Sequence, residues 1–216
     1  MKYPNASKGL QTIVIAEFIA AAASILAVIV SALAFSSAEA SETEQYTFGA
    51  VSIIMLVIVA MYIAAFVLEI IGIMKAGKDE PAFKVSLYAI IAAIILTILS
   101  GFFYENETVF LMISIAGDVA QFFLVHYIIH GIMHLSNHLG RPEVSKKGKK
   151  IFTIIYLGIM FEVIVRVIEI IYGHKRAEEI ALPFDVIANI LKSVEYIMFL
   201  IYILKGSKML KESKGE

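Results

Sequence analysis

Six long apolar segments run through the chain, and each is long enough to cross a membrane as a helix. A transmembrane helix needs about 20 apolar residues to cover roughly 30 Å of hydrocarbon. None of the segments alternates apolar and polar residues as a barrel strand does. The sequence therefore predicts an all-α integral membrane protein, a single membrane domain over residues 1–216 with six transmembrane helices. The predicted spans are Leu10–Phe35, Phe48–Met74, Val85–Phe103, Val109–Met133, Ile151–Tyr172 and Phe184–Leu204.

The composition excludes several other classes of protein. Apolar residues make up 60% of the chain and charged residues 17%, whereas soluble domains are roughly 45–50% apolar and about 25% charged. The 18 basic and 19 acidic residues nearly cancel, so the positive charge that a nucleic-acid binder needs is missing. The chain contains no Cys, which excludes disulfides and thiolate metal sites. The predicted partner is therefore the lipid bilayer and not a nucleic acid.

The distribution of Lys and Arg predicts how the spans are oriented. Short loops that are rich in Lys and Arg stay in the cytoplasm. Here both chain ends, residues 75–84 and residues 141–150 carry nearly all of the basic residues outside the spans. We therefore expect a multi-pass protein of the cell membrane with both termini in the cytoplasm. The alternative is a signal peptide that ends near Ala38-Glu39-Ala40, but the apolar run before it is longer than signal peptides use.

The predicted cytoplasmic ends of the even-numbered spans resemble one another. Each carries a glycine, and the three are Gly72, Gly131 and Gly206. Aligning them also aligns three polar residues, Tyr62, Gln121 and Tyr196. This pattern predicts three parallel two-helix hairpins, over residues 7–79, 80–144 and 145–213. The alternative is that helix ends on this side favour Gly and Lys for capping and because of the helix dipole.

Ionisable residues within the last three spans are the most informative feature for function. Glu162, Arg166 and Glu169 are spaced four and three apart in the fifth span, so they share one helix face. The fourth and sixth spans add further polar residues, namely Asp118, Gln121, Asn189, Lys192 and Glu195. A charge at the membrane centre costs about 2.5–3.5 kcal/mol on insertion scales. We therefore expect these side chains to face one another or a water-filled cavity.

The acidic excess of this cluster leaves two interpretations open. Its carboxylates outnumber Arg166 and Lys192, so protons, a bound cation or a basic group would have to balance the charge. This favours a protein that transports or binds a small solute or cation at these residues. The alternative is a network of ion pairs that fixes how the last three helices pack.

A second candidate site lies nearer the predicted cytoplasmic side. His126 and His130 are four residues apart in the fourth span, which is the spacing of a bidentate metal pair on a helix. Glu69 or Glu17 would complete a set of two histidines and a carboxylate for a divalent metal, the cofactor that this pattern suggests. The alternative is that both histidines form hydrogen bonds between helices.

Motifs of the common enzyme classes are missing from the sequence. The chain has no G-x-S-x-G, no H-E-x-x-H and no glycine-rich phosphate loop, so we name no catalytic residue. The first span has small residues four apart, such as Ala16, Ala20 and Ser24, which allow close contact with another helix of the chain or with a partner subunit. The alternative function is therefore a non-transporting accessory, regulatory or immunity-type subunit that acts through helix–helix contacts.

Overall fold

The computed structural model of the chain describes residues 2–38, 44–172 and 174–213, and in these ranges it forms six helices and no strand. The helices are α1 (Pro4–Ala38), α2 (Glu44–Ala76), α3 (Ala82–Phe102), α4 (Glu107–His138), α5 (Pro142–Tyr172) and α6 (His174–Glu212). Each contains a segment that is long and apolar enough to cross a membrane. The predicted all-α fold with six spans is thereby confirmed. Two residues of the signal-like sequence, Glu39 and Ala40, lie outside the described residues.

Three of the four prolines mark helix starts. Pro4 and Pro142 are the first residues of α1 and α5, and Pro81 immediately precedes α3. The first turn of a helix tolerates proline because its N–H groups have no partner within the helix. Pro183 lies inside α6, in the N-terminal third of that helix. The helices extend past the predicted spans because polar turns, such as those that follow Pro142, remain helical outside the apolar segment.

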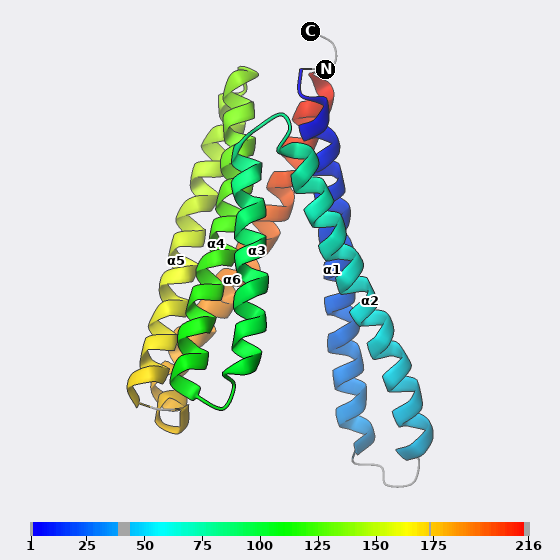
Figure 1. The fold of residues 1–216 in the computed structure, drawn as a ribbon, viewed down its shortest axis with the longest axis vertical. Coiled ribbons are helices and arrows are strands. Elements are labelled where there is room, and N and C mark those ends of the chain that lie inside the picture. The colour runs from blue at the N-terminus through cyan, green and yellow to red at the C-terminus, as the bar shows by residue number, and fades with distance from the viewer. Residues whose placement is uncertain (1, 39–43, 173, 214–216) are drawn as a thin grey trace.

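Consecutive helices run in opposite directions, so both ends of the chain lie at one end of the molecule, here called the terminal end (Figure 1). Helices α3, α4 and α5 stand side by side, whereas α1 and α2 form a separate hairpin. The two groups meet near the terminal end and diverge toward the opposite, far end. Helix α6 starts beside α5 at the far end and crosses to α1 at the terminal end, so it joins the two groups.

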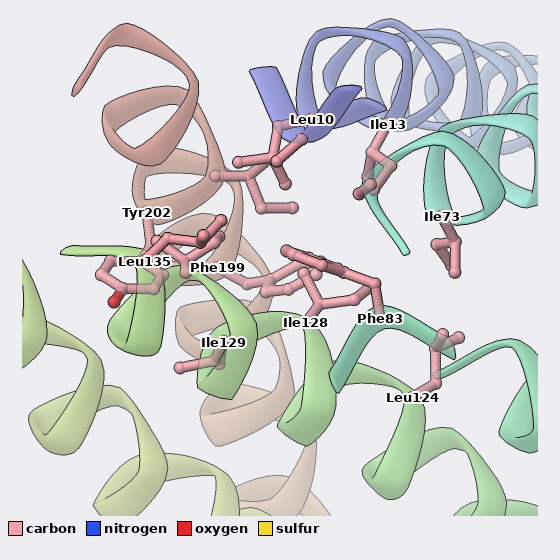
Figure 2. Close-up of a cluster of buried hydrophobic side chains, with 14 of the residues drawn as sticks. Leu10, Ile13, Ile73, Phe83, Leu124, Ile128, Ile129, Leu135, Phe199 and Tyr202 are labelled. Carbon is pink, nitrogen blue, oxygen red and sulfur yellow. The ribbon is translucent and has the colours of Figure 1, made fainter. Parts of the chain in front are cut away.

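The main apolar core lies toward the terminal end, and all six helices contribute to it. Leu10, Ile73, Phe83, Ile128 and Tyr202 come from five different helices and are all buried (Figure 2). Elsewhere most apolar side chains of the spans point outward. In the apolar 18-residue stretch of each span, at most 22% of the residues are buried. Such a surface suits contact with lipid and not with water. The chain is therefore a polytopic membrane protein.

The three aligned glycines all lie at close contacts between helices. A Cβ atom added to Gly72 would lie 2.8 Å from a backbone oxygen of α1. At Gly131 it would lie 2.8 Å from the Phe83 ring, and at Gly206 2.8 Å from Cγ2 of Ile132. Gly72 and Gly131 thus contact the first helix of their own hairpin, but Gly206 contacts α4. The repeat of three hairpins remains a prediction.

The small-residue face of α1 packs against α2. Ala16 and Ala23 are buried, and Ala23 lies in a small apolar cluster with Ile58 of α2. The hydroxyl oxygens of Ser24 and Tyr62 are 2.9 Å apart. The neighbour of this face within the chain is therefore α2, and binding of a partner subunit to α1 remains a prediction.

Candidate functional site

A cavity of about 340 Å³ lies between α4, α5 and α6, and we call it the α5–α6 cavity. Its apolar walls include Val165, Leu182 and Ala188. Its polar lining consists of Asp118, Glu162, Arg166, Glu169, Asp185, Asn189 and Lys192. Helical spacing explains why these residues meet, because side chains three or four positions apart project from the same face of α5 or of α6. Asp118 of α4 completes the wall.

Two ion pairs organise the charges of this cavity. Nζ of Lys192 lies 2.8 Å from Oε1 of Glu162, which joins α6 to α5. NH1 of Arg166 lies 3.2 Å from Oε2 of Glu169 on the same helix. The two cations therefore each have a carboxylate partner. Among the residues that the structure describes, the carboxylate of Asp118 forms no such pair.

A second cavity, of about 180 Å³, lies at the point where α6 crosses between the two groups of helices, and we call it the central cavity. Helices α1, α2, α4, α5 and α6 all contribute to it. Its polar lining consists of Glu17, Glu69, Asp118, Gln121, Glu162, Lys192, Glu195 and Tyr196. The remaining wall is apolar and consists of the rings of Phe122 and Phe199 and the aliphatic side chains of Leu124, Val125, Ile155 and Ile159. Gly158 of α5 lies nearby, and a Cβ atom at this position would be in ordinary contact with Oε2 of Glu195, 3.4 Å away.

The two cavities share part of their walls. Asp118, Glu162 and Lys192 line both of them, so the ion pair between α5 and α6 stands at their boundary. The Lys192 side chain is 66% exposed in spite of its pairing, because it borders open space on both sides. The structure therefore brings all eight predicted binding residues of the last three spans to the walls of two adjoining cavities. Asp185 and Tyr196 extend this set.

Glu17 and Glu69 lie in the central cavity and not beside the histidines with which the metal-site prediction grouped them. The hydroxyl of Tyr196 donates a hydrogen bond of 3.1 Å to the backbone oxygen of Glu17, which fixes α6 against α1. This placement depends on where α6 crosses α1. Spacing along the sequence carries no signal for it.

His126 and His130 lie on one face of α4, and their ring centroids are 6.4 Å apart. His126 stacks on Phe152 of α5 with a centroid distance of 4.5 Å. Within residues 2–38, 44–172 and 174–213, the structure contains no group of three His, Asp or Glu side chains that could hold a metal ion. The four residues of the predicted metal site are therefore not brought together.

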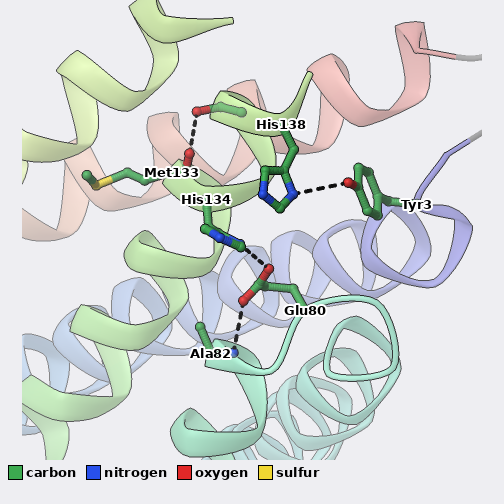
Figure 3. Close-up of polar contacts among 7 residues, drawn as sticks. Tyr3, Glu80, Ala82, Met133, His134 and His138 are labelled. Carbon is green, nitrogen blue, oxygen red and sulfur yellow. Dashed lines mark hydrogen bonds and ion pairs between the residues drawn. The ribbon is translucent and has the colours of Figure 1, made fainter. Parts of the chain in front are cut away.

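The terminal end holds a polar cluster that the sequence patterns did not indicate (Figure 3). Glu80 precedes α3 and is 6% exposed. One of its carboxylate oxygens lies 2.6 Å from Nδ1 of His134, and the other accepts a hydrogen bond of 3.2 Å from the backbone N–H of Ala82. The rings of His134 and His138 are 4.2 Å apart, and Nδ1 of His138 lies 3.3 Å from the hydroxyl of Tyr3. This Glu80–His134 cluster joins the segment before α1 and the α2–α3 connection to the end of α4.

The neighbouring Asp79 holds the start of α1. Its carboxylate accepts hydrogen bonds of 2.8 Å from the Asn5 side chain and from the backbone N–H of Ala6. The unpaired N–H groups at a helix start favour such a carboxylate. The position of Glu80 just before α3 agrees with the preference of helix starts for negative charge. Its pairing with His134, 54 residues away, has no local signal in the sequence.

The comparisons with known proteins add no relative from which a site could be transferred. No protein-family model, no curated protein and no solved structure matches the chain.

Proposed function

We propose that the chain binds a small cation or cationic solute in the two adjoining cavities and transports it across the membrane. The observation that supports this most is the charge of the walls. The cavities are lined by two cations, Arg166 and Lys192, and by a larger set of carboxylates. These carboxylates are Glu17, Glu69, Asp118, Glu162, Glu169, Asp185 and Glu195.

The ion pairs account for only part of this charge. Glu162 and Glu169 are paired, whereas Glu69, Asp118 and Glu195 form no ion pair in the described part of the chain. An isolated charge in the membrane interior costs about 2.5–3.5 kcal/mol or more. Protons or a bound cation would offset this cost, and the open volume beside these groups leaves room for a cation.

A purely structural role for the cluster explains less. The Lys192–Glu162 pair joins α6 to α5 and would by itself be enough to fix how these two helices pack. Such a role gives no reason for the further carboxylates of Glu69 on α2 and Asp118 on α4, which line the same open space and form no ion pair in the described part of the chain. Exchange of a cation for protons on these carboxylates does give a reason, because both would compete for the same oxygen atoms.

The test is a flux measurement on purified protein in liposomes. The panel consists of H⁺, Na⁺, K⁺, Mg²⁺ and small organic ammonium ions. We expect flux of at least one of them above that of empty liposomes, and a loss of at least tenfold in the double variant Glu162→Gln/Glu195→Gln. The matched control is Glu143→Gln, which makes the same chemical change at an exposed position at the start of α5 and should leave flux unchanged.

Two results would overturn the proposal. If no member of the panel moves, transport is wrong, and the accessory role predicted as the alternative gains weight. Affinity purification from native membranes would then be expected to recover a second protein in a fixed ratio. If flux is present but the double variant retains it in full, transport stands and these cavities are not its route.

A further inference from the structure

We infer that the ligand is an amphipathic organic cation, with its charged group in the central cavity and its apolar part in a groove between α2, α3 and α4. This inference rests on the proposed function, because it specifies the class of cation that the same site takes. It arises from a third hollow, of about 380 Å³, that adjoins the central cavity. We call this hollow the α2–α4 groove.

The groove and the central cavity share three residues. Glu69, Gln121 and Leu124 line both, so the Glu69 carboxylate stands where the two spaces meet. Apart from these three shared residues, the groove is lined by apolar side chains and by one polar side chain, Thr97. Its further lining consists of Phe66, Ile90, Ala93, Ile94 and Ile98. A ligand that fills both spaces would therefore have one charged end and one apolar end.

The sizes of the two spaces agree with this division. Small-molecule sites usually enclose about 300–1,000 Å³. The central cavity, with about 180 Å³, is below that range and suits a small charged group alone. The groove, with about 380 Å³, has room for a bulkier apolar group.

The groove also lies where a ligand would arrive from the lipid. Helix α2 diverges from α3 and α4 toward the far end of the molecule (Figure 1). The groove side chains Phe66, Ile94 and Ile98 are exposed along these spans. In a bilayer such side chains contact hydrocarbon. An apolar cation that is dissolved in the membrane would therefore reach Glu69 sideways.

The walls of the central cavity favour an organic cation over a metal ion. A divalent metal needs several oxygen or nitrogen ligands at short and defined distances. In the ranges that the structure covers, no three His, Asp or Glu side chains are placed in that way. The cavity instead combines carboxylates with the rings of Phe122, Tyr196 and Phe199. Aromatic faces attract quaternary ammonium and similar cations that carry little hydration.

Three probes separate charge from apolar character. Tetraphenylphosphonium is a bulky apolar cation, tetraphenylborate has the same shape and the opposite charge, and tetramethylammonium is a small cation without the apolar bulk. Binding of each to the purified protein in detergent is measured by calorimetry. We expect tetraphenylphosphonium to bind at least tenfold more tightly than either of the other two.

Two variants test where in the structure tetraphenylphosphonium binds. Glu69→Gln removes the charge at the junction with little change in shape, and it should weaken tetraphenylphosphonium binding at least tenfold. Ile94→Ala shortens an exposed side chain of the groove, and it should weaken tetraphenylphosphonium binding severalfold while leaving tetramethylammonium unchanged. Glu143→Gln again serves as the control. Size-exclusion profiles that match those of the unchanged protein show that each variant is folded.

Each of the other possible outcomes contradicts a specific part of the inference or of the proposed function. Binding of tetramethylammonium without tetraphenylphosphonium contradicts this inference and leaves the proposed function intact. Equal binding of tetraphenylborate shows apolar partition only and also contradicts it. If Glu69→Gln binds as tightly as the unchanged protein, the charged group is not at this junction. If no cation binds and the flux panel is also negative, the inference and the proposed function both fail.

Discussion

Nζ of Lys192 on α6 lies 2.8 Å from Oε1 of Glu162 on α5, at the boundary that the two acidic cavities share. The pair therefore both joins two helices and separates two open spaces. Its contribution to stability can be measured apart from its contribution to binding.

Removal of either partner of this pair should destabilise the protein, and removal of both should cost less than the sum of the two. We expect Lys192→Met and Glu162→Gln to show a coupling energy of about 1 kcal/mol in a double-mutant cycle, since residues in contact couple by that order. Reversible unfolding in mixed micelles measures it. The pair of Lys208 and Glu212, 3.9 Å apart and largely exposed, is the comparison, and its coupling should be near zero. Equal coupling energies in the two pairs would show that the pair of Lys192 and Glu162 contributes no more to stability than an exposed ion pair does.

The close contact of α1 with α2 should not tolerate a methyl group. In Gly72→Ala the new Cβ would lie 2.6 Å from Cγ1 of Ile13 and 2.8 Å from a backbone oxygen, so the helices must separate. We expect a loss of about 1–3 kcal/mol, the usual effect of overpacking, measured by unfolding. Gly117→Ala is the control, because its added Cβ would meet no described atom within 4 Å apart from its chain neighbours and the backbone of its own helix. A stable Gly72→Ala would show that the hairpin can move apart at little cost.

The carboxylate of Glu80 should stabilise the terminal end. It accepts hydrogen bonds from His134 and from the backbone of Ala82 while almost fully buried. We expect Glu80→Gln to lower the free energy of unfolding by about 1.5–3 kcal/mol, the range for hydrogen bonds to charged groups. Tyr3→Phe removes the long and exposed contact with His138 and should change it by less than about 0.5 kcal/mol. A larger loss of stability in Tyr3→Phe than in Glu80→Gln would contradict the stabilising role of the Glu80 carboxylate.

The hydroxyl of Tyr202 should be dispensable. Tyr202 is 2% exposed, and within the described residues its hydroxyl oxygen has no hydrogen-bond partner. A buried polar atom without a partner lowers stability, so Tyr202→Phe should leave the free energy of unfolding unchanged or raise it by about 1 kcal/mol. Tyr202→Leu, which also removes the ring, should lower it. A clear loss in Tyr202→Phe would reveal a partner of the hydroxyl.

The orientation can be tested directly because the chain contains no Cys. Lys147→Cys places a thiol at the terminal end and Glu105→Cys places one at the far end. The excess of Lys and Arg at the terminal end predicts that it faces the cytoplasm. A membrane-impermeant maleimide should therefore label Glu105→Cys in intact cells and Lys147→Cys only in inverted vesicles. The opposite pattern would reverse the predicted topology.

The spans were predictable because hydrophobic length alone defines a transmembrane helix. The spacing of Glu162, Arg166 and Glu169 also predicted correctly that they share one face of α5, because helical spacing is a local property. The sequence did not reveal that Glu162 pairs with Lys192 while Arg166 pairs with Glu169. Partner choice between helices depends on how each helix is rotated about its axis. In a span that is apolar on nearly every face, periodicity does not determine that rotation.

The location of Glu17 and Glu69 illustrates the same limit. Their depth along α1 and α2 suggested the level of His126, but the α1–α2 hairpin diverges from α4 and meets α6 instead. The two groups of helices pack together at the terminal end, where Leu10 and Ile73 of the hairpin lie in one buried cluster with Ile128 of α4. Such contacts join distant parts of the sequence, so no local pattern encodes them.

The hydrogen bond from Tyr196 to Glu17 joins residues that are 179 positions apart, and this separation has a consequence for the order of biosynthesis. A ribosome completes α1 and α2 long before it reaches α6. Glu17 and Glu69 therefore enter the bilayer before Glu162, Lys192 and Tyr196 exist. Helix α6, which is made after the other five described helices, supplies a further wall of the central cavity. A nascent chain that has been made only as far as the end of α2 holds the carboxylates of Glu17 and Glu69 without the α4, α5 and α6 residues that complete the walls of the central cavity.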